Sequence, residues 1–312
     1  SISLKATPPW MTGEEALDRS LRLTGARHPL LTGDVVPVSL DLGSEYSVML
    51  ITGPNAGGKT VTLKTVGMLA LMAHAGLHVP AEEAHFPLLD GVYADIGDQQ
   101  SIEQALSTFS SHVQNLLSIM GQATVNSLVL VDELGTSTDP EEGSALASAI
   151  LGHLGGLGPL VVATTHHRGV ARYVQETPGM INASVDLDPR TLGPTYRVTL
   201  GLPGRSYALT IAARLGLPAE VIEQARTSMS PVERDTESLL GELQEERRLV
   251  EQLRQDAEAA LAESRQQQAE TESRLATVEA AKVEMLEESR QELQIQIADL
   301  LDRLQPVSYT HL

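Results

Sequence analysis

The sequence of 312 residues contains no cysteine, which excludes disulfides, thiolate zinc sites and cysteine nucleophiles together. Aromatic residues are scarce, with two Phe, one Trp and six Tyr, and this disfavours a surface that stacks many unpaired bases. Basic residues are also in the minority, since 22 Lys and Arg face 41 Asp and Glu, for a net charge of −19. Because of this negative charge, we do not expect the chain to bind nucleic acid over its whole surface. We therefore expect any DNA or RNA contact to be a local patch or to come from other segments.

Long hydrophobic runs are missing as well. The longest clean apolar stretch, near Val66–Ala73, is far too short to span a bilayer, and the first residues do not resemble a signal peptide. The apolar fraction of 42% is enough for a buried core in one large domain, or in a medium domain with an extension. Because the chain opens with Ser1, we expect a cytoplasmic piece of a longer protein that makes no contact with a membrane.

Glycine and proline are nearly absent from the last quarter of the chain. Between the two prolines that bound residues 231–306 there is one glycine, Gly241, and no proline. Residues 233–304 carry 19 acidic and 9 basic side chains, and leucines recur there at three- and four-residue spacing on either side of the glutamines at 266–268. The pattern predicts an acidic helical extension, either a coiled-coil arm or an antiparallel hairpin with a polar middle. A lone solvated helix that requires a missing partner is the alternative.

Residues 26–230 alternate short β-branched runs with helical patterns. Such alternation is typical of an α/β fold, a mostly parallel sheet with helices on both faces. The predicted strands and the helices that follow them are 48–52 with 61–75, 127–131 with 144–154, and 160–165 with 169–176. Residues 1–25 show no clear period and are interpreted as a linker remnant. Residues 307–312 continue no heptad, so we exclude them from the fold as a truncation or cloning remnant.

The strongest motif is GPNAGGKT at Gly53–Thr60, which matches the phosphate-binding pattern G-x-x-x-x-G-K-[ST]. It directly follows a predicted strand and opens a predicted helix, as the mechanism requires. Glycines let successive backbone N–H groups curl around phosphates, and the helix N-terminus adds partial positive charge. We expect Lys59 to reach the β- and γ-phosphates of ATP, and the Thr60 hydroxyl to bind Mg²⁺. The alternative is a chance glycine-rich turn, and the strand–helix context argues against it.

Two later strands also end in groups that suit nucleotide chemistry. The apolar run Leu128–Val131 is followed by Asp132 and Glu133. Behind a P-loop at this distance, Asp132 is expected to hold the Mg²⁺ shell and Glu133 to orient or deprotonate the attacking water. The next predicted strand delivers His166 and His167 at its end. We expect His166 to sense the γ-phosphate and interpret His167 as a polar residue that closes a strand.

Further segments strengthen this interpretation. The run LSTFSSH at 106–112 opens a predicted helix, and by itself Ser107 or Thr108 would be an ordinary N-cap. Together with the motifs above and RHPLL at 27–31, it resembles the ATPase domain of the MutS family, which belongs to the ABC-type ATPases. The resemblance covers roughly residues 20–230. It is closer to the second bacterial branch, MutS-two, than to the mismatch-repair branch, on the runs GPNAGGKTVTLKTVG (53–67), DPEEG (139–143) and GRSYA (204–208).

The resemblance implies a head-to-tail homodimer in which each nucleotide lies between one subunit's P-loop and the partner's Ser-Thr-Phe segment. Ser107 is then the signature serine acting in trans, His166 the switch histidine, and Asp132 with Glu133 the Walker B pair. The loop at 135–139 would cross the dimer interface. The implied cofactors are ATP and Mg²⁺. The implied nucleotide-binding residues are Gly53, Pro54, Asn55, Ala56, Gly57, Gly58, Lys59, Thr60 and Val61.

The function that this family implies is Mg²⁺-dependent ATP hydrolysis powering a DNA-structure-binding dimer that restrains homologous recombination. The alternatives are an ATPase acting on stalled or collided ribosomes, a mismatch-repair ATPase, and a structural coiled-coil protein with a degenerate nucleotide site. The intact Lys59, Thr60, Asp132 and Glu133 argue against the last of these. We expect the DNA-holding segments of the family to precede Ser1. Because nothing here resembles the small MutS-related nuclease domain, we do not expect nuclease activity from this chain.

Overall fold

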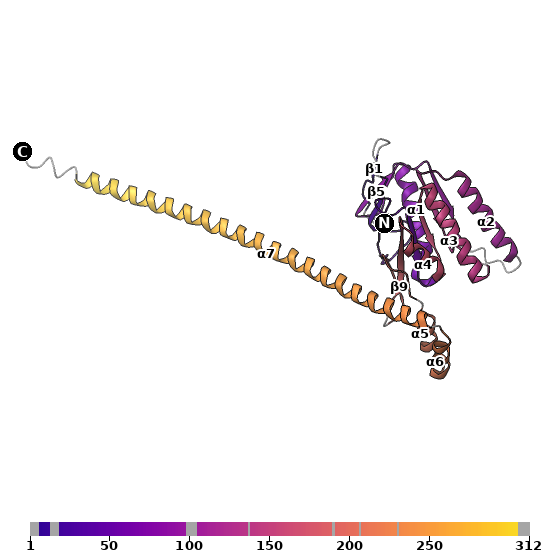
Figure 1. Cartoon of the computed structure of the whole chain (residues 1–312). Helices are drawn as coiled ribbons and strands as arrows, with labels where there is room; N and C mark the ends of the chain where they lie inside the picture. Colours follow the sequence, from indigo (N-terminus) through magenta and orange to yellow (C-terminus); the bar gives the residue numbers. More distant parts are fainter. Residues whose placement is uncertain are drawn as a thin grey trace, which may run out of the picture. The chain divides into compact units, whose positions relative to one another are not determined.

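The computed structural model of the protein describes residues 6–12, 19–97, 105–136, 138–188, 191–205, 207–229 and 231–304. The chain divides into two compact units, residues 1–241 and 242–312 (Figure 1). Among the described residues, no helix combines the length and the apolar character needed to cross a membrane.

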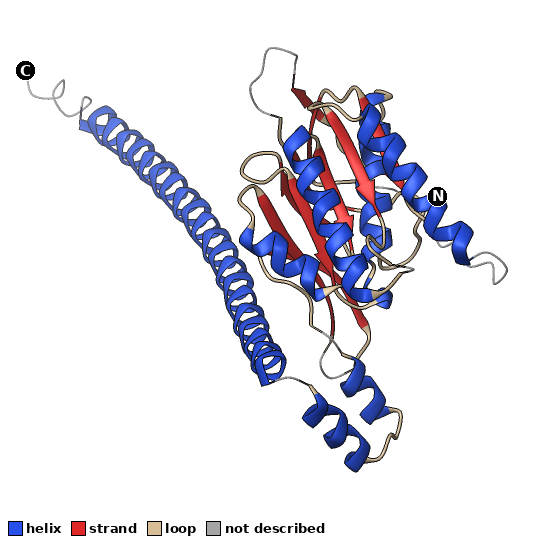
Figure 2. Cartoon of the chain, turned by 45° about the vertical axis from the view of Figure 1, so that its right-hand side comes forward, coloured by secondary structure: helices blue, strands red, loops and turns tan. Residues whose placement is uncertain are grey.

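The first unit is built on a six-stranded sheet with the order β10-β9-β4-β8-β7-β6 (Figure 2). Neighbouring strands run parallel from β9 to β6, and only the edge strand β10 is antiparallel to its neighbour. The bounds are β4 (Val48–Thr52), β6 (Gly91–Asp95), β7 (Ser127–Val131), β8 (Leu160–Thr164), β9 (Met180–Leu187) and β10 (Pro194–Leu200). This confirms the predicted α/β fold with a mostly parallel sheet, and the three strands predicted from the sequence lie side by side within it.

Helices cover both faces of this sheet because each central strand sends side chains alternately into two cores. Val48 and Leu50 of β4 belong to one core, whereas Met49 and Ile51 belong to the other. The first core includes residues of α2, α3 and α4, and the second includes the buried face of α1. Strands buried on both sides read as continuous apolar runs, which is why the sequence revealed them. The helices are α1 (Lys59–His74), α2 (Ala105–Gln122), α3 (Pro140–Leu157) and α4 (Arg168–Glu176).

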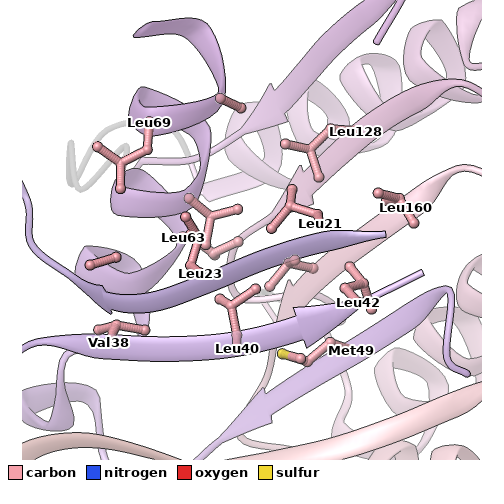
Figure 3. Packing of buried hydrophobic residues seen from close by; sticks show 14 of the residues in the cluster. Leu21, Leu23, Val38, Leu40, Leu42, Met49, Leu63, Leu69, Leu128 and Leu160 are labelled. Carbon is pink, nitrogen blue, oxygen red and sulfur yellow. The ribbon is translucent and has the colours of Figure 1, made fainter. Parts of the chain in front are cut away.

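A second, four-stranded sheet shares one hydrophobic core with α1 (Figure 3). Its order is β1-β5-β2-β3, formed by β1 (Trp10–Thr12), β2 (Leu21–Ala26), β3 (Val38–Leu42) and β5 (Glu83–Pro87). The segment 1–25, interpreted as a linker, instead supplies β1 and most of β2. Leu21 and Leu23 are only 0% and 1% exposed, so β2 is part of the core.

Two helix starts differ from the sequence-based expectation. Helix α3 begins four residues before Ser144, because the Asp139 carboxylate accepts the N–H groups of Glu141 (2.9 Å) and Glu142 (3.2 Å) and Pro140 takes the first helical position. Helix α2 begins at Ala105 and contains Ser107 and Thr108 in its first turn. The alternative in which either residue caps this helix is therefore wrong.

After β10, the described residues are mostly helical. Short helices α5 (Ala208–Arg214) and α6 (Ala219–Ser228) precede α7 (Pro231–Leu304), a single helix of 74 residues that extends into the second unit (Figure 1). The glutamines at 266–268 lie inside α7, so the hairpin alternative is wrong for these residues. Apolar side chains such as Leu253 and Leu293 stay more than half exposed on α7. The coiled-coil arm remains a prediction.

Candidate nucleotide-binding site

The candidate site lies at the edge of the sheet where three parallel strands end together. Strands β4, β8 and β7 are adjacent, and their registers pair Ile51 with Thr164 and Val131 with Ala163. The segment that follows each strand therefore emerges at the same edge. These segments are the glycine-rich loop at 53–60, the pair Asp132 and Glu133, and the two histidines at 166–167. The structure thus gathers the motifs that the sequence spreads over more than 110 positions.

The glycine-rich loop has the backbone of an anion cradle. It winds through a short 3₁₀ helix, η1 (Asn55–Gly57), and passes into α1 through Gly58, whose φ is 97°. Within the described residues no side chain caps α1, so its first N–H groups are open to an anion. At Gly53, where φ is 130°, a Cβ atom would lie 2.1 Å from the carbonyl oxygen of Val185. Only glycine fits there, because any side chain would collide with the backbone of β9.

Lys59 holds its charge inside the loop. The residue is 3% exposed, and its Nζ donates to the Gly53 carbonyl oxygen (2.6 Å) and to Asn55 Oδ1 (2.9 Å). Burial lowers the pKa of the Lys59 ammonium, whereas the carboxylates of Glu133 and Asp132 act to raise it. A buried ammonium is costly unless it is hydrogen-bonded and paired. The loop and the two acids together keep a positive charge where phosphates would bind.

Thr164 fixes the pair of acids that follows β7. Its hydroxyl donates to Asp132 Oδ1 (2.5 Å) and accepts the backbone N–H of Glu133 (2.8 Å), while its carbonyl oxygen accepts the N–H of Leu134 (2.8 Å). Glu133 has φ of 50°, in the left-handed region that ordinary residues avoid. Such a conformation costs on the order of 1–3 kcal/mol and persists only where the surroundings enforce it. The chain therefore turns sharply as soon as the strand ends.

The two histidines after β8 have different surroundings. His167 Nε2 donates to the Gly135 carbonyl oxygen at 2.9 Å, which ties β8 to the loop after β7. The His166 ring lies 4.6 Å from that of His167. Partial burial lowers the pKa of the His166 imidazole, and the neighbouring His167 and Lys59 lower it further. His166 therefore takes up a proton less readily than a free imidazole does, whereas His167 acts as a structural contact.

The sequence of the part around this site matches a known family. Residues 49–233 fit the family model described as MutS domain V. The chain belongs to the MutS family. MutS domain V is an ABC-type P-loop ATPase domain, so the fold class and the resemblance are both confirmed.

The relatives of this MutS chain include proteins named Endonuclease MutS2 from several bacteria. The protein of Bacillus velezensis is 49% identical over 248 residues, which cover 79% of this chain and 31% of that protein. The protein of Brevibacillus brevis is 52% identical over 225 residues, or 72% of this chain and 29% of the relative. The protein of a Geobacillus species is 49% identical over 252 residues, or 80% and 32%. The chain thus spans about a third of the length of these curated relatives.

The oxygen donors of this MutS domain fit Mg²⁺. Thr60 lies in the first turn of α1, and Asp132, which is 5% exposed, directly follows β7. Mg²⁺ prefers such hard oxygen ligands and usually completes its shell with water and substrate phosphates. No group of three or more His, Asp and Glu in the described ranges is arranged to hold a metal by itself. Thr60 and Asp132 are therefore suited to bind Mg²⁺ together with a nucleotide.

The structure adds residues that the sequence analysis missed. The Tyr196 ring lies against the phosphate loop, so close that a Cβ at Gly58 would be 2.9 Å from Tyr196 Cδ1. The Gly204 N–H donates to Thr52 Oγ1 at 2.6 Å, which brings the GRSYA segment to the base of that loop. No spacing or periodicity marks Tyr196, because it approaches Gly58 only through the pairing of β10 with β9.

A hydrogen-bonded cluster around the buried Asp95 was missed as well. Asp95, at the end of β6, accepts from His112 Nδ1 (2.5 Å) and Asn115 Nδ2 (3.1 Å) of α2. The hydrogen bond to Asp95 raises the pKa of His112, and the charges of Glu133 and Asp132 add to this effect. The only sequence signal was two polar residues three apart on one helix. The side chain of Ser107 and residue 137 of the loop at 135–139 lie outside the described residues, so the roles of Ser107 and of this loop stay predictions.

Thr164→Val should destabilise the first unit by about 1–3 kcal/mol, because it leaves Asp132 Oδ1 and the Glu133 N–H without their hydroxyl partner. Valine preserves the shape of threonine, so the loss reports the hydrogen bonds and not a cavity. Thr164→Ser keeps the hydroxyl and serves as the control, with stability closer to that of the parent. Urea unfolding followed by tyrosine fluorescence measures both variants. A valine variant as stable as the serine variant would show that the network does not hold the turn.

Proposed function

We propose that this chain hydrolyses ATP in the presence of Mg²⁺, and that hydrolysis drives a homodimer that binds DNA structures and restrains homologous recombination. The observation that carries the proposal is the meeting of Lys59, Asp132 and Glu133 at one sheet edge in a chain with MutS domain V. A phosphate cradle, a buried cation and two acids next to it are the parts that phosphoryl transfer needs.

Each group has a distinct task in the proposed reaction. The N–H groups at the start of α1 and the Lys59 ammonium bind the β- and γ-phosphates and offset their charge. Thr60 and Asp132 would hold Mg²⁺, which when bound supplies further positive charge to the phosphates. Glu133 accepts a proton as water attacks the γ-phosphorus, so that ADP and inorganic phosphate leave. The His166 imidazole contacts the γ-phosphate and orients it.

The second half of each site is proposed to come from a partner subunit. Ser107 lies in the first turn of α2, a helix whose N-terminus suits a phosphate on another chain. The loop at 135–139 would then cross the interface. In this arrangement two nucleotides are enclosed between two copies of the domain, and neither copy has a complete site alone.

The target is proposed to be branched DNA, held mainly by segments outside these 312 residues. The relatives carry the name endonuclease, which describes enzymes that cut nucleic acid. The charge of −19 and the few aromatic residues argue that this part of the protein is not the main DNA-binding surface. The domain would supply energy, and the longer protein would supply the contacts.

Two substitutions test the ATPase assignment. Lys59→Ala should lose nucleotide binding, because the phosphates lose their buried counter-charge. Glu133→Gln should still bind ATP but hydrolyse it about 10²–10⁴-fold more slowly, since an amide cannot accept the proton of water. Fluorescent-nucleotide binding and phosphate release measure the two effects separately. Turnover at the parent rate in Lys59→Ala, or unslowed hydrolysis in Glu133→Gln, would contradict the assignment.

Mixing two inactive variants tests the role of Ser107 in trans. Lys59→Ala removes the P-loop cation and Ser107→Arg blocks the Ser-Thr-Phe segment, so each homodimer should be inactive. In the mixed dimer, the intact P-loop of the Ser107→Arg subunit faces the intact Ser-Thr-Phe segment of the Lys59→Ala subunit. One of the two sites is thereby restored. Random exchange makes about half of the dimers mixed, so activity should return to about a quarter of that of the parent. If Ser107 serves the nucleotide of its own subunit, mixing restores nothing after subunit exchange has been demonstrated.

The target can be tested with a full-length relative of the same architecture. We expect it to bind four-way DNA junctions more tightly than matched linear duplexes at physiological salt, and to release them on ATP hydrolysis. Purified stalled ribosomes and mismatched duplexes are the comparison ligands. Preference for ribosomes would favour ribosome rescue, and preference for mismatches would favour mismatch repair. Either result would overturn the recombination assignment while leaving the ATPase assignment intact.

A further inference from the structure

Asp95 is a buried acid that the proposed reaction does not use. It is 7% exposed and ends β6, next to β7, and its carbonyl oxygen accepts the backbone N–H of Asp132 at 2.8 Å. A buried carboxylate is costly unless its oxygens are hydrogen-bonded. Asp95 therefore lies at the same sheet edge as the proposed Walker B acids, and its buried carboxylate needs hydrogen-bond donors.

The partners come from α2. His112 Nδ1 binds one oxygen of Asp95 at 2.5 Å, and Asn115 Nδ2 donates to the other at 3.1 Å. Residues three apart share a helix face, so both reach the same carboxylate. Because Nδ1 of His112 is turned towards Asp95, the other ring nitrogen is turned away from it. A carboxylate that orients an imidazole in this way fixes both the position of the ring and its proton.

His112 and Glu133 line the same small cavity. Of the two α2 side chains that hold Asp95, His112 is the one that lines a small cavity whose wall also includes Glu133, Leu134 and Thr136. The cavity has about 20 Å³ of room, enough for one water molecule. The remaining wall is largely apolar and comes from α2 and α3, with Phe109, Leu116 and Ile150 among its residues. His112 and Glu133 thus share the wall of one small, largely apolar cavity, where electrostatic interactions are stronger than in bulk water.

We propose that His112 is a positioning residue for Glu133, held in place by Asp95 and acting on the Glu133 carboxylate across this cavity. The inference rests on the proposed role of Glu133 as the base in ATP hydrolysis. Thr164 holds the backbone N–H of Glu133, and keeping a side chain with three rotatable bonds in one rotamer costs conformational entropy. An oriented imidazole on the side of α2 restricts that side chain to the rotamer that meets the attacking water.

His112→Ala should lower kcat for ATP hydrolysis by about 10–100-fold, since small displacements of a reacting group cost up to about 10²-fold. The KM for ATP should stay within about twofold, because Lys59 and the phosphate loop are unchanged. Asn115→Ala is the matched control. It removes the other hydrogen bond to the same carboxylate but leaves the imidazole in the cavity, so kcat should stay close to that of the parent. Equal losses of kcat in both variants would mean that His112 only anchors α2.

A double-mutant cycle tests whether His112 acts on hydrolysis through Glu133. Adding His112→Ala to Glu133→Gln should slow hydrolysis by less than about twofold further, because the side chain that His112 positions can no longer act as the base. A full additional 10–100-fold loss would show that His112 acts on another group. If His112→Ala does not fold, Asp95→Asn takes its place, since it keeps the volume and weakens the hold on the ring. It should lower kcat by a smaller factor and show the same lack of additivity.

The two hypotheses fail in different ways. If Glu133→Gln itself hydrolyses ATP at the parent rate, the proposed function of this site is wrong. If Glu133→Gln is slow while His112→Ala matches the parent, the ATPase assignment stands and only the positioning role of His112 is lost.

Discussion

Backbone hydrogen bonds align β4, β8 and β7 in parallel, so that all three strands end at one edge of the sheet. The rest of the site depends on this alignment. Each strand is buried on both faces, and a slip of one residue would exchange the side chains of the two cores. Burial therefore locks the register, and the register sets where the loop, the acids and the histidines emerge. The geometry of the proposed site therefore follows from the packing of the sheet between its two cores.

Burial of charge is the second constraint on the site. Lys59, Asp132 and Asp95 are each less than a tenth exposed, and each has hydrogen-bonding partners from another strand, loop or helix. Such charges are costly to bury and strongly destabilising when one partner is removed. The protein meets this cost with short polar side chains on neighbouring segments, Thr164 above all. A nucleotide would then meet groups that are already oriented, so little reorganisation is needed during the reaction.

The sequence predicted the elements whose signal is local. The predicted bounds of β4 and β7 agree with the structure, because continuous apolar runs bounded by polar or glycine residues mark buried strands. The sheet that contains β2 and β5 was missed, since its pairings join residues such as Arg22 and His85, more than 60 positions apart. The hairpin alternative for α7 was wrong because glutamine favours a helix, and a polar run changes the surface of a helix without ending it.

The sequence by itself determined the phosphate loop, the order of the acids and histidines, and the helical character of the tail, because short-range sterics and hydrogen bonds decide each of these. The tertiary structure alone decided which groups join them. Tyr196 reaches Gly58, Gly204 reaches Thr52, and His112 reaches Asp95 from elements whose distance in the sequence gives no sign of contact. Those contacts depend on the order of the strands and on which helix covers which face of the sheet. Both are decided only when the two hydrophobic cores form together.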